Sequence, residues 1–328
     1  PLVIGLDAMR ANPKAFAHNM SLVAAYPGVR AEGTPDEIAE AFINHVVSNL
    51  LALYDAMPAA TRDRAKLWYE GANAIATKWS REYGYPKEAI AATLAALSPQ
   101  KDWFQNVSLA ERVLDIHSTF TRGNMVGFFP DDEMRATAER IYGKPKYAEA
   151  LETVLALPYA EQPTAEYKAM WLRVYDETYN PRGFRTVSPE GAFVGEPSGN
   201  VAWGSNVEIG KAIQAIEDAS PENISKVLGL RHKVRNFYNN IVAPNAGTDV
   251  TSDTHAVAAA LLRPLSGNSV EVAHNFGNNI PTKKRPEGWQ AAKAAAAFGA
   301  RGVYGLYADA YRRAAEARPD ALAHRLLP

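Results

Sequence analysis

A carboxylate directly before an alanine-rich segment is the strongest candidate for chemistry in this sequence. Asp253 lies in the run Thr-Ser-Asp-Thr-His, residues 251–255, at the expected start of a helix. An aspartate there accepts backbone N–H bonds, which is a purely structural and very common role. Such a carboxylate also stays ionised at neutral pH, so it can accept a proton or stabilise a developing cation. The two roles are compatible.

Four basic or potentially basic side chains stand upstream of Asp253, after a Leu-Gly-Leu run that predicts a tight turn into a helix. They are Arg231, His232, Lys233 and Arg235. Clustered cations at a helix start are typical of a phosphate or pyrophosphate site. The alternatives are a basic helix face and, for Lys233, an ordinary solvated lysine.

A third segment follows the Leu-Ser-Pro break at residues 97–99. It contains Gln100, Lys101, Asp102 and Trp103. Amide and aromatic side chains at a helix end can hydrogen-bond a nucleobase and stack on it. The alternative interpretation makes Trp103 a core residue and Gln100 a turn residue.

Helical periodicity dominates the chain and predicts an all-α fold. A capping sequence at 34–37 opens the first expected helix, whose apolar stripe runs to residue 53. Further helices are expected near 68–79, 86–97 and 107–114. Others are expected at about 131–142, 147–156, 164–176, 207–219, 221–228, 231–242, 253–263, 289–298 and 303–317.

Residues 180–205 break this pattern with five glycines and three prolines. Short apolar pieces between them predict a long loop or a small β-hairpin excursion. It is either a lid or binding loop or a tolerated surface insertion. The rest divides into a core lobe at 86–265 and a second helical lobe formed by 1–85 and 266–328, with a cleft between them.

In order and spacing, the three segments resemble the helix-hairpin-helix DNA glycosylase superfamily. The motifs are Leu-Ser-x-Gln, then Gly-x-x-x-Lys, then Asp-Thr-His, and the resemblance covers roughly 86–120 and 222–265. It implies a two-lobed helical fold in which Gln100 probes DNA, the hairpin binds a DNA phosphate, and Lys233 and Asp253 are catalytic. His255 belongs to the third motif and is expected to contact the substrate.

Two departures point to a divergent branch. Arg231 replaces the second glycine of the usual Gly-x-Gly hairpin, where a side chain would crowd a phosphate. The segment between the first two motifs is also long. The chain looks like the phage thymine-hypermodification enzymes called α-glutamyl/putrescinyl thymine pyrophosphorylases, or amino acid:DNA transferases. That resemblance implies transfer of an amino acid or amine onto the 5-methylene of pyrophosphorylated 5-hydroxymethyluracil in DNA, with loss of pyrophosphate.

Two other functions remain open. A DNA glycosylase, with or without AP lyase activity, would remove a modified base, using Lys233 to attack the sugar carbon. A non-catalytic DNA-binding protein could be built on the same scaffold. The expected partners are DNA with an activated modified thymine and an amino acid or polyamine donor, and no cofactor is expected.

Composition excludes several kinds of site. The chain of 328 residues has no cysteine, which rules out disulfides, thiolate zinc sites and iron–sulfur clusters. The seven histidines are scattered, so no metal site is expected. A net charge of -1 disfavours a protein that covers nucleic acid non-specifically, because phosphate binding needs clustered Lys and Arg. No membrane span or signal peptide is expected, and we expect a cytoplasmic, phage-encoded protein acting in the infected bacterial cell.

Overall fold

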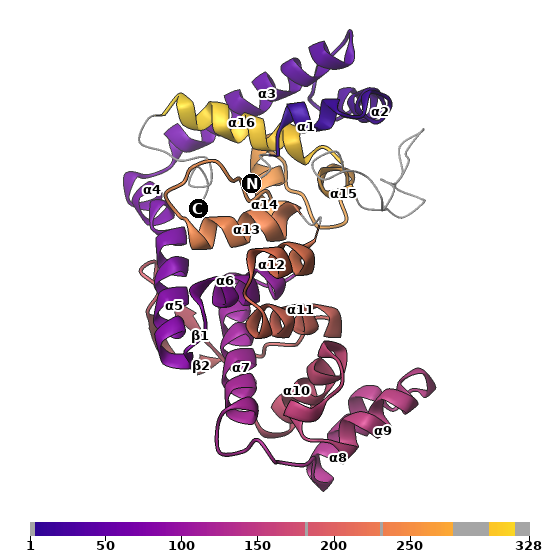
Figure 1. Cartoon of the computed structure of the whole chain (residues 1–328). Helices are drawn as coiled ribbons and strands as arrows, with labels where there is room; N and C mark the ends of the chain where they lie inside the picture. The colour runs from indigo at the N-terminus through magenta and orange to yellow at the C-terminus, as the bar shows by residue number, and fades with distance from the viewer. Residues whose placement is uncertain (1–3, 181–182, 230–231, 278–301, 319–328) are drawn as a thin grey trace. The chain divides into compact units, whose positions relative to one another are not determined.

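The computed structural model describes residues 4–180, 183–229, 232–277 and 302–318. These residues form many α-helices and one two-stranded antiparallel sheet (Figure 1). The expected all-helical character, with a small hairpin excursion, is therefore confirmed. In the described part of the chain, no helix is both long and apolar enough to cross a membrane.

Contacts divide the chain into two compact units. Unit 1 contains residues 1–70 and 230–328, and unit 2 contains residues 71–229. The boundaries therefore fall earlier than the sequence analysis placed them, at 85/86 and 265/266. The second boundary lies at 229/230 and not at 265/266 because the helix that follows Asp253 packs against helices of the terminal segments.

In unit 1, helix α3 is the central element, and α2, α14 and α16 all pack against it. Its start has both halves of a capping box, since the Thr34 N–H donates to Glu37 Oε2 at 2.7 Å and the Glu37 N–H donates to Thr34 Oγ1 at 3.3 Å. Phe42 of α3 meets the ring of Tyr307 edge-on in the core. The helices of unit 1 are α1 (Leu6–Arg10), α2 (Pro13–Ala24), α3 (Pro35–Ala56), α4 (Ala59–Lys66), the start of α5 (Trp68–Tyr83), α13 (His232–Val242), α14 (Thr254–Leu261), α15 (Val270–Phe276) and α16 (Tyr304–Glu316).

In unit 2, helix α6 is buried along most of its length, and α11 packs against both α6 and α10. A helix that is apolar all round is typical of the centre of a helical core. After the rest of α5, its elements are α6 (Lys87–Ala96), α7 (Trp103–Thr121), α8 (Asp132–Tyr142), a 3₁₀ turn at Pro145–Tyr147, α9 (Ala148–Ala156), a 3₁₀ turn at Tyr159–Glu161, α10 (Ala165–Tyr179), β1 (Phe184–Val187), β2 (Phe193–Ser198), α11 (Asn206–Glu217) and α12 (Pro221–Leu228).

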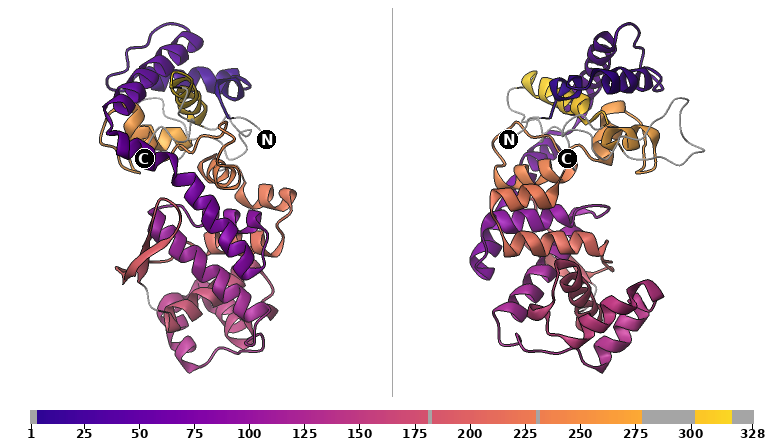
Figure 2. Two further views of the ribbon diagram at one scale, coloured as in Figure 1. Left: turned by 90° about the vertical axis from the view of Figure 1, so that its left-hand side faces the viewer. Right: turned by 45° about the vertical axis from the view of Figure 1, so that its right-hand side comes forward.

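The hairpin formed by β1 and β2 lies against α7 (Figure 2). The ring of Phe193 stacks on Trp79 of α5, with centroids 6.2 Å apart, and the guanidinium of Arg185 lies 4.2 Å from the same ring. The turn of the hairpin approaches α5 closely. Gly191 has a φ of +86°, and a Cβ there would lie 2.5 Å from the carbonyl oxygen of Gly71, so only glycine fits.

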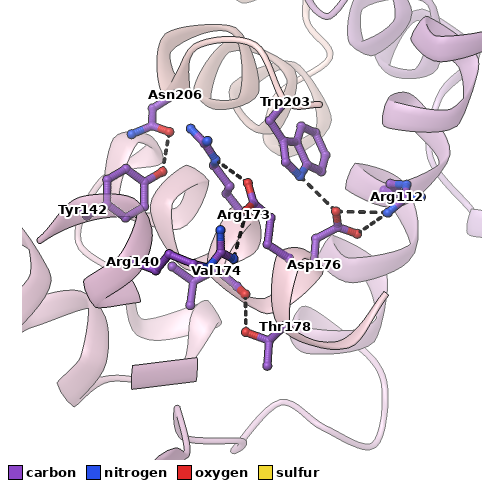
Figure 3. Close-up of polar contacts among 10 residues, drawn as sticks. Arg112, Arg140, Tyr142, Arg173, Val174, Asp176, Thr178, Trp203 and Asn206 are labelled. Atoms are coloured by element: carbon purple, nitrogen blue, oxygen red, sulfur yellow. Dashed lines mark hydrogen bonds and ion pairs between the residues drawn. The ribbon is translucent and has the colours of Figure 1, made fainter. Parts of the chain in front are cut away.

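A buried polar network ties this excursion to the helices on either side (Figure 3). Asp176 of α10 accepts hydrogen bonds on both carboxylate oxygens from Arg112 of α7, at 3.0 and 3.1 Å. It also accepts a hydrogen bond from the indole N–H of Trp203 at 2.9 Å. A further one comes from the side-chain amide of Asn180 at 2.8 Å. Arg112 donates further to the carbonyl of Gly183. Both ends of the excursion are thus attached to a single ion pair.

Helix ends differ from the predicted ones by a few residues. Helix α14 ends at Leu261 rather than 263 because Leu262 adopts a left-handed conformation with a φ of +48°. The expected helix at 289–298 lies outside the described residues.

Candidate active site

Asp253 is the N-cap of α14. Its Oδ1 accepts a hydrogen bond from the backbone N–H of Ala256 at 2.9 Å, and the side chain is half-buried. Helix α14 buries its apolar face in the core of unit 1, where Val257 and Ala260 are fully covered. The carboxylate is therefore fixed on a rigid element and still has exposed surface, which a general base requires.

The loop that leads into Asp253 is held from α13. The side-chain amide of Asn239 donates to Asp249 Oδ1 at 2.9 Å, and that of Asn240 donates to Thr251 Oγ1 at 3.0 Å. The hydroxyl of Tyr69, at the start of α5, also hydrogen-bonds with Thr251 and Asn240. Burial raises the pKa of Tyr69 to about 12, so this tyrosine stays neutral.

The same loop is held on its other side by α15 and α16. The hydroxyl of Tyr304 accepts from the N–H of Ser252 and donates to the carbonyl of Val250, each at 2.7 Å. The hydroxyl of Tyr311 donates to the carbonyl of Ala256 at 2.8 Å. The amide of Asn275 donates to the carbonyl of Ser252 at 3.4 Å. Each such bond contributes about 0.5–1.5 kcal/mol, and together they leave the loop one conformation.

Lys233 lies in the first turn of α13 and is half-buried. Burial lowers the pKa of its ammonium, and the negative charge of Asp253 opposes part of that fall. Lys233 and Asn240 are seven residues apart, which places them on one face of α13. The side chain of Asn240 bonds to Thr251, and the charge of Asp253 affects the pKa of Lys233. That face of α13 is therefore directed at the loop before α14. Lys233 and Asp253, which are twenty residues apart in sequence, thus interact electrostatically.

Among the described residues, the members of the expected cationic cluster differ in their surroundings. His232 is buried, and its ring meets that of Tyr304 edge-on with centroids 5.1 Å apart. Arg235 is half-buried, burial lowers its pKa, and its charge interacts with Asp249. Successive helix residues point about 100° apart, so neighbours along one turn cannot all face one ligand. The role of His232 as a phosphate ligand stays a prediction for a side chain that is buried in this structure, and Arg231 lies outside the described residues.

Gln100 belongs to unit 2, at the tip of a tight turn between α6 and α7. The turn closes with the N–H of Lys101 donating to the carbonyl of Ser98 at 3.3 Å, and Pro99 is its second residue. Gln100 is exposed and has a φ of +58°, a conformation that non-glycine residues rarely adopt. The side chain of Gln100 is thus presented to solvent at a strained position, as at many functional sites.

The neighbours of Gln100 begin α7. Asp102 is the N-cap and accepts from the N–H of Gln105 at 2.8 Å. Lys101 and Trp103 are half-buried. These residues belong to unit 2, whereas Lys233 and Asp253 belong to unit 1. His255, in the first turn of α14, is exposed.

Sequence reasoning missed the tyrosine and asparagine side chains that hold the Asp253 loop. Tyr304 and Tyr311 lie within an alanine-rich helix and are 52 and 55 residues from the groups they bond. Their spacing is that of an ordinary buried helix face. The described residues also contain no group of three His, Asp or Glu side chains that could hold a metal ion.

A family of unknown function, DUF7178, matches residues 34–151, from the start of α3 to within α9. This segment includes Gln100 and its neighbours but not Lys233 or Asp253. No curated protein and no solved structure matches the chain.

Proposed function

We propose that this protein is a DNA base-modifying transferase, an amino acid:DNA transferase that acts on pyrophosphorylated 5-hydroxymethyluracil. The observation that supports it most is a half-buried lysine, Lys233, whose ammonium interacts electrostatically with a helix-capping aspartate, Asp253, of the same compact unit. Gly229 ends α12 with a φ of +62°, and its N–H donates to the carbonyl of Ser225, as expected of a glycine that closes a helix.

The proposed reaction is a substitution at the exocyclic methylene carbon of the base. The amine nitrogen of the donor forms a bond to that carbon, and the bond from carbon to the pyrophosphate oxygen breaks. Pyrophosphate leaves with the electron pair, and the ammonium of Lys233 offsets its growing negative charge. The nitrogen then loses one proton, which Asp253 accepts and passes to solvent. The target base must leave the duplex or be presented in a single strand.

The test uses the purified full chain, DNA containing pyrophosphorylated 5-hydroxymethyluracil, and a mixture of amino acids and polyamines. The DNA is digested to nucleosides and analysed by mass spectrometry. A nucleoside that has gained one amine and lost the pyrophosphate supports the proposal and identifies the donor. Unchanged DNA with every donor, from protein that binds this DNA, contradicts it and favours a non-catalytic DNA-binding protein.

Matched variants locate the chemistry. Asp253→Asn keeps a side-chain oxygen that can cap α14 but removes the charge, and Lys233→Met keeps the bulk of the lysine. Both should abolish transfer. The controls are Asp131→Asn, which changes another N-cap aspartate, and Lys226→Met, which changes an exposed lysine of α12. Both controls should transfer at the wild-type rate.

A DNA glycosylase with lyase activity is the second candidate, and the lowered pKa of Lys233 favours it. A lysine that is more easily deprotonated is a better nucleophile, as a Schiff-base mechanism requires. Borohydride reduction during reaction with DNA carrying a modified thymine would then link the protein to the DNA covalently through Lys233. Base release with this cross-link, and no amine adduct, would make the protein a glycosylase.

A further inference from the structure

Tyr304 touches both sides of the Lys233–Asp253 pair. Its hydroxyl bonds to Ser252 and Val250 in the loop that ends at Asp253, and its ring packs against His232, the residue before Lys233. We propose that Tyr304 is a positioning residue that sets the separation between Lys233 and Asp253. The catalytic part of this inference, that Tyr304 affects transfer, rests on the proposed function. The geometric part, that Tyr304 sets the separation of the two side chains, does not.

The hydroxyl of Tyr304 spans two peptide groups. With one oxygen it accepts the N–H of residue 252 and donates to the carbonyl of residue 250, both at 2.7 Å. These two peptide groups directly precede the one that joins Ser252 to Asp253, so fixing them restricts where the carboxylate of Asp253 can lie. Tyr304 is fully buried, and burial raises its pKa far above the usual value, so the hydroxyl keeps its proton.

The ring of Tyr304 acts on the opposite partner. The imidazole of His232 meets it edge-on at 5.1 Å, and His232 is the first residue of α13. Edge-to-face ring pairs have a preferred geometry, so this contact fixes the start of α13 against α16. Lys233 follows directly. One side chain from α16 therefore connects the start of α13 to the start of α14.

The neighbouring tyrosine of α16 supplies a matched control. Tyr307 lies one turn further along the helix and is as fully buried as Tyr304. Its hydroxyl has no hydrogen-bond partner among the described residues. Tyr304→Phe and Tyr307→Phe thus remove the same atom from the same helix, but only the first removes bonds to the Asp253 loop.

The test is a double-mutant cycle on the pKa of Lys233, which requires no catalysis. Lysines of the full chain are ¹³C-methylated, and the pKa of Lys233 is read by NMR. Replacing Asp253 with Asn should lower that pKa, because the charge of Asp253 raises it. The size of this fall measures how close the two groups are held. It should be at least halved in Tyr304→Phe and unchanged in Tyr307→Phe.

Two further readouts complete the test. Amide hydrogen exchange at Ser252 should accelerate at least about tenfold in Tyr304→Phe, because its hydrogen-bond acceptor is gone. In the transferase assay, kcat should fall about 10- to 100-fold with little change in KM, as expected when reacting groups are misplaced. If the wild-type protein shows no transfer, kcat cannot be compared, and that outcome counts against the proposed function. The pKa measurement would still test the role of Tyr304, because it requires no catalysis.

A full-sized effect of Asp253→Asn on Lys233 in Tyr304→Phe protein would overturn the inference. If Tyr304→Phe fails to fold, His232→Leu is the substitute. This variant removes the ring contact near Lys233 while leaving both hydrogen bonds of Tyr304 in place, and it should also reduce the effect of Asp253 on Lys233. An unreduced effect in a folded His232→Leu protein would likewise overturn the inference.

Discussion

Asp253 accepts a hydrogen bond at 2.9 Å from the backbone N–H of Ala256, so the side chain proposed to accept a proton also begins helix α14. One oxygen of the carboxylate is thus committed to the helix, while the residue as a whole is only half-buried. The cap and the chemistry can be separated by substitution, because an amide retains the first function and loses the second.

We therefore expect Asp253→Asn to leave the free energy of unfolding nearly unchanged and Asp253→Ala to lower it by about 0.5–2 kcal/mol. Both should lose transfer. Chemical denaturation followed by circular dichroism measures the first effect and the mass-spectrometric assay the second. Equal stability losses in the two variants would show that the charge, and not the cap, is what Asp253 contributes to folding.

Lys233→Met should stabilise the folded protein while abolishing transfer. The pKa of Lys233 is lowered on folding, which means that the folded state binds this proton less tightly than the unfolded state does. The free-energy cost of removing the ammonium from water is therefore larger than the stabilisation that the charge of Asp253 provides. In the pH range between the folded and unfolded pKa values, stability rises with pH, and Lys233→Met should flatten that rise.

Lys226→Met is the control for this prediction, since Lys226 is exposed on α12. It should change neither the stability nor its pH dependence. Urea titrations between pH 7 and pH 10.5 measure both variants. A less stable Lys233→Met protein would show that the ammonium makes a favourable ion pair in the folded state.

Local sequence patterns were enough to predict the elements that carry the site. The Ser-Asp-Thr sequence before an alanine-rich run predicts an N-cap, and the structure has one at Asp253. The basic run is less informative, because a run of cations does not show which of them the helix buries. His232 is buried, and the charge of Arg235 interacts with Asp249.

What the sequence could not indicate is the support behind the site. Tyr304, Tyr311 and Asn275 reach the Asp253 loop from helices that are far away in sequence, and nothing local separates them from ordinary buried residues. Tyr304 and Tyr307 illustrate this: both occupy the same buried face of α16, but among the described residues only the hydroxyl of Tyr304 has hydrogen-bond partners. Long-range hydrogen bonds of this kind appear only when the tertiary structure is known.

Two buried histidines should make the protein sensitive to acid. Burial lowers the pKa of His274, in unit 1, and of His117, in unit 2, to about 3. His274 is held neutral, since its Nε2 donates to Asn19 Oδ1 at 2.9 Å and its Nδ1 accepts from Tyr26. The free energy of unfolding should fall as pH drops from about 6.5 toward 3, by up to about 1.4 kcal/mol per pH unit for each histidine.

Urea titrations between pH 7 and pH 4 test this dependence. His274→Gln removes one titrating group and should reduce the slope of stability against pH below 6.5, whatever its effect at pH 7. His255→Gln changes an exposed histidine and should leave the slope unchanged. The same slope in wild-type and His274→Gln proteins would contradict the prediction.

The ion pair between Arg112 and Asp176 should be essential to unit 2. Their side chains are 11% and 3% exposed, and the carboxylate also accepts the indole N–H of Trp203. Asp176→Ala leaves a buried guanidinium without its counter-charge, which costs about 3–5 kcal/mol. It also releases both ends of the hairpin excursion, so limited proteolysis should cut within residues 183–205 faster than in the wild type.

Glu82→Ala is the control, because its pair with Lys78 is 3.7 Å long and both side chains are about half exposed (50% and 57%). That variant should unfold at nearly the wild-type urea concentration. If Asp176→Ala behaved like Glu82→Ala, the excursion would be held by the stacking of Phe193 on Trp79 and not by the buried ion pair.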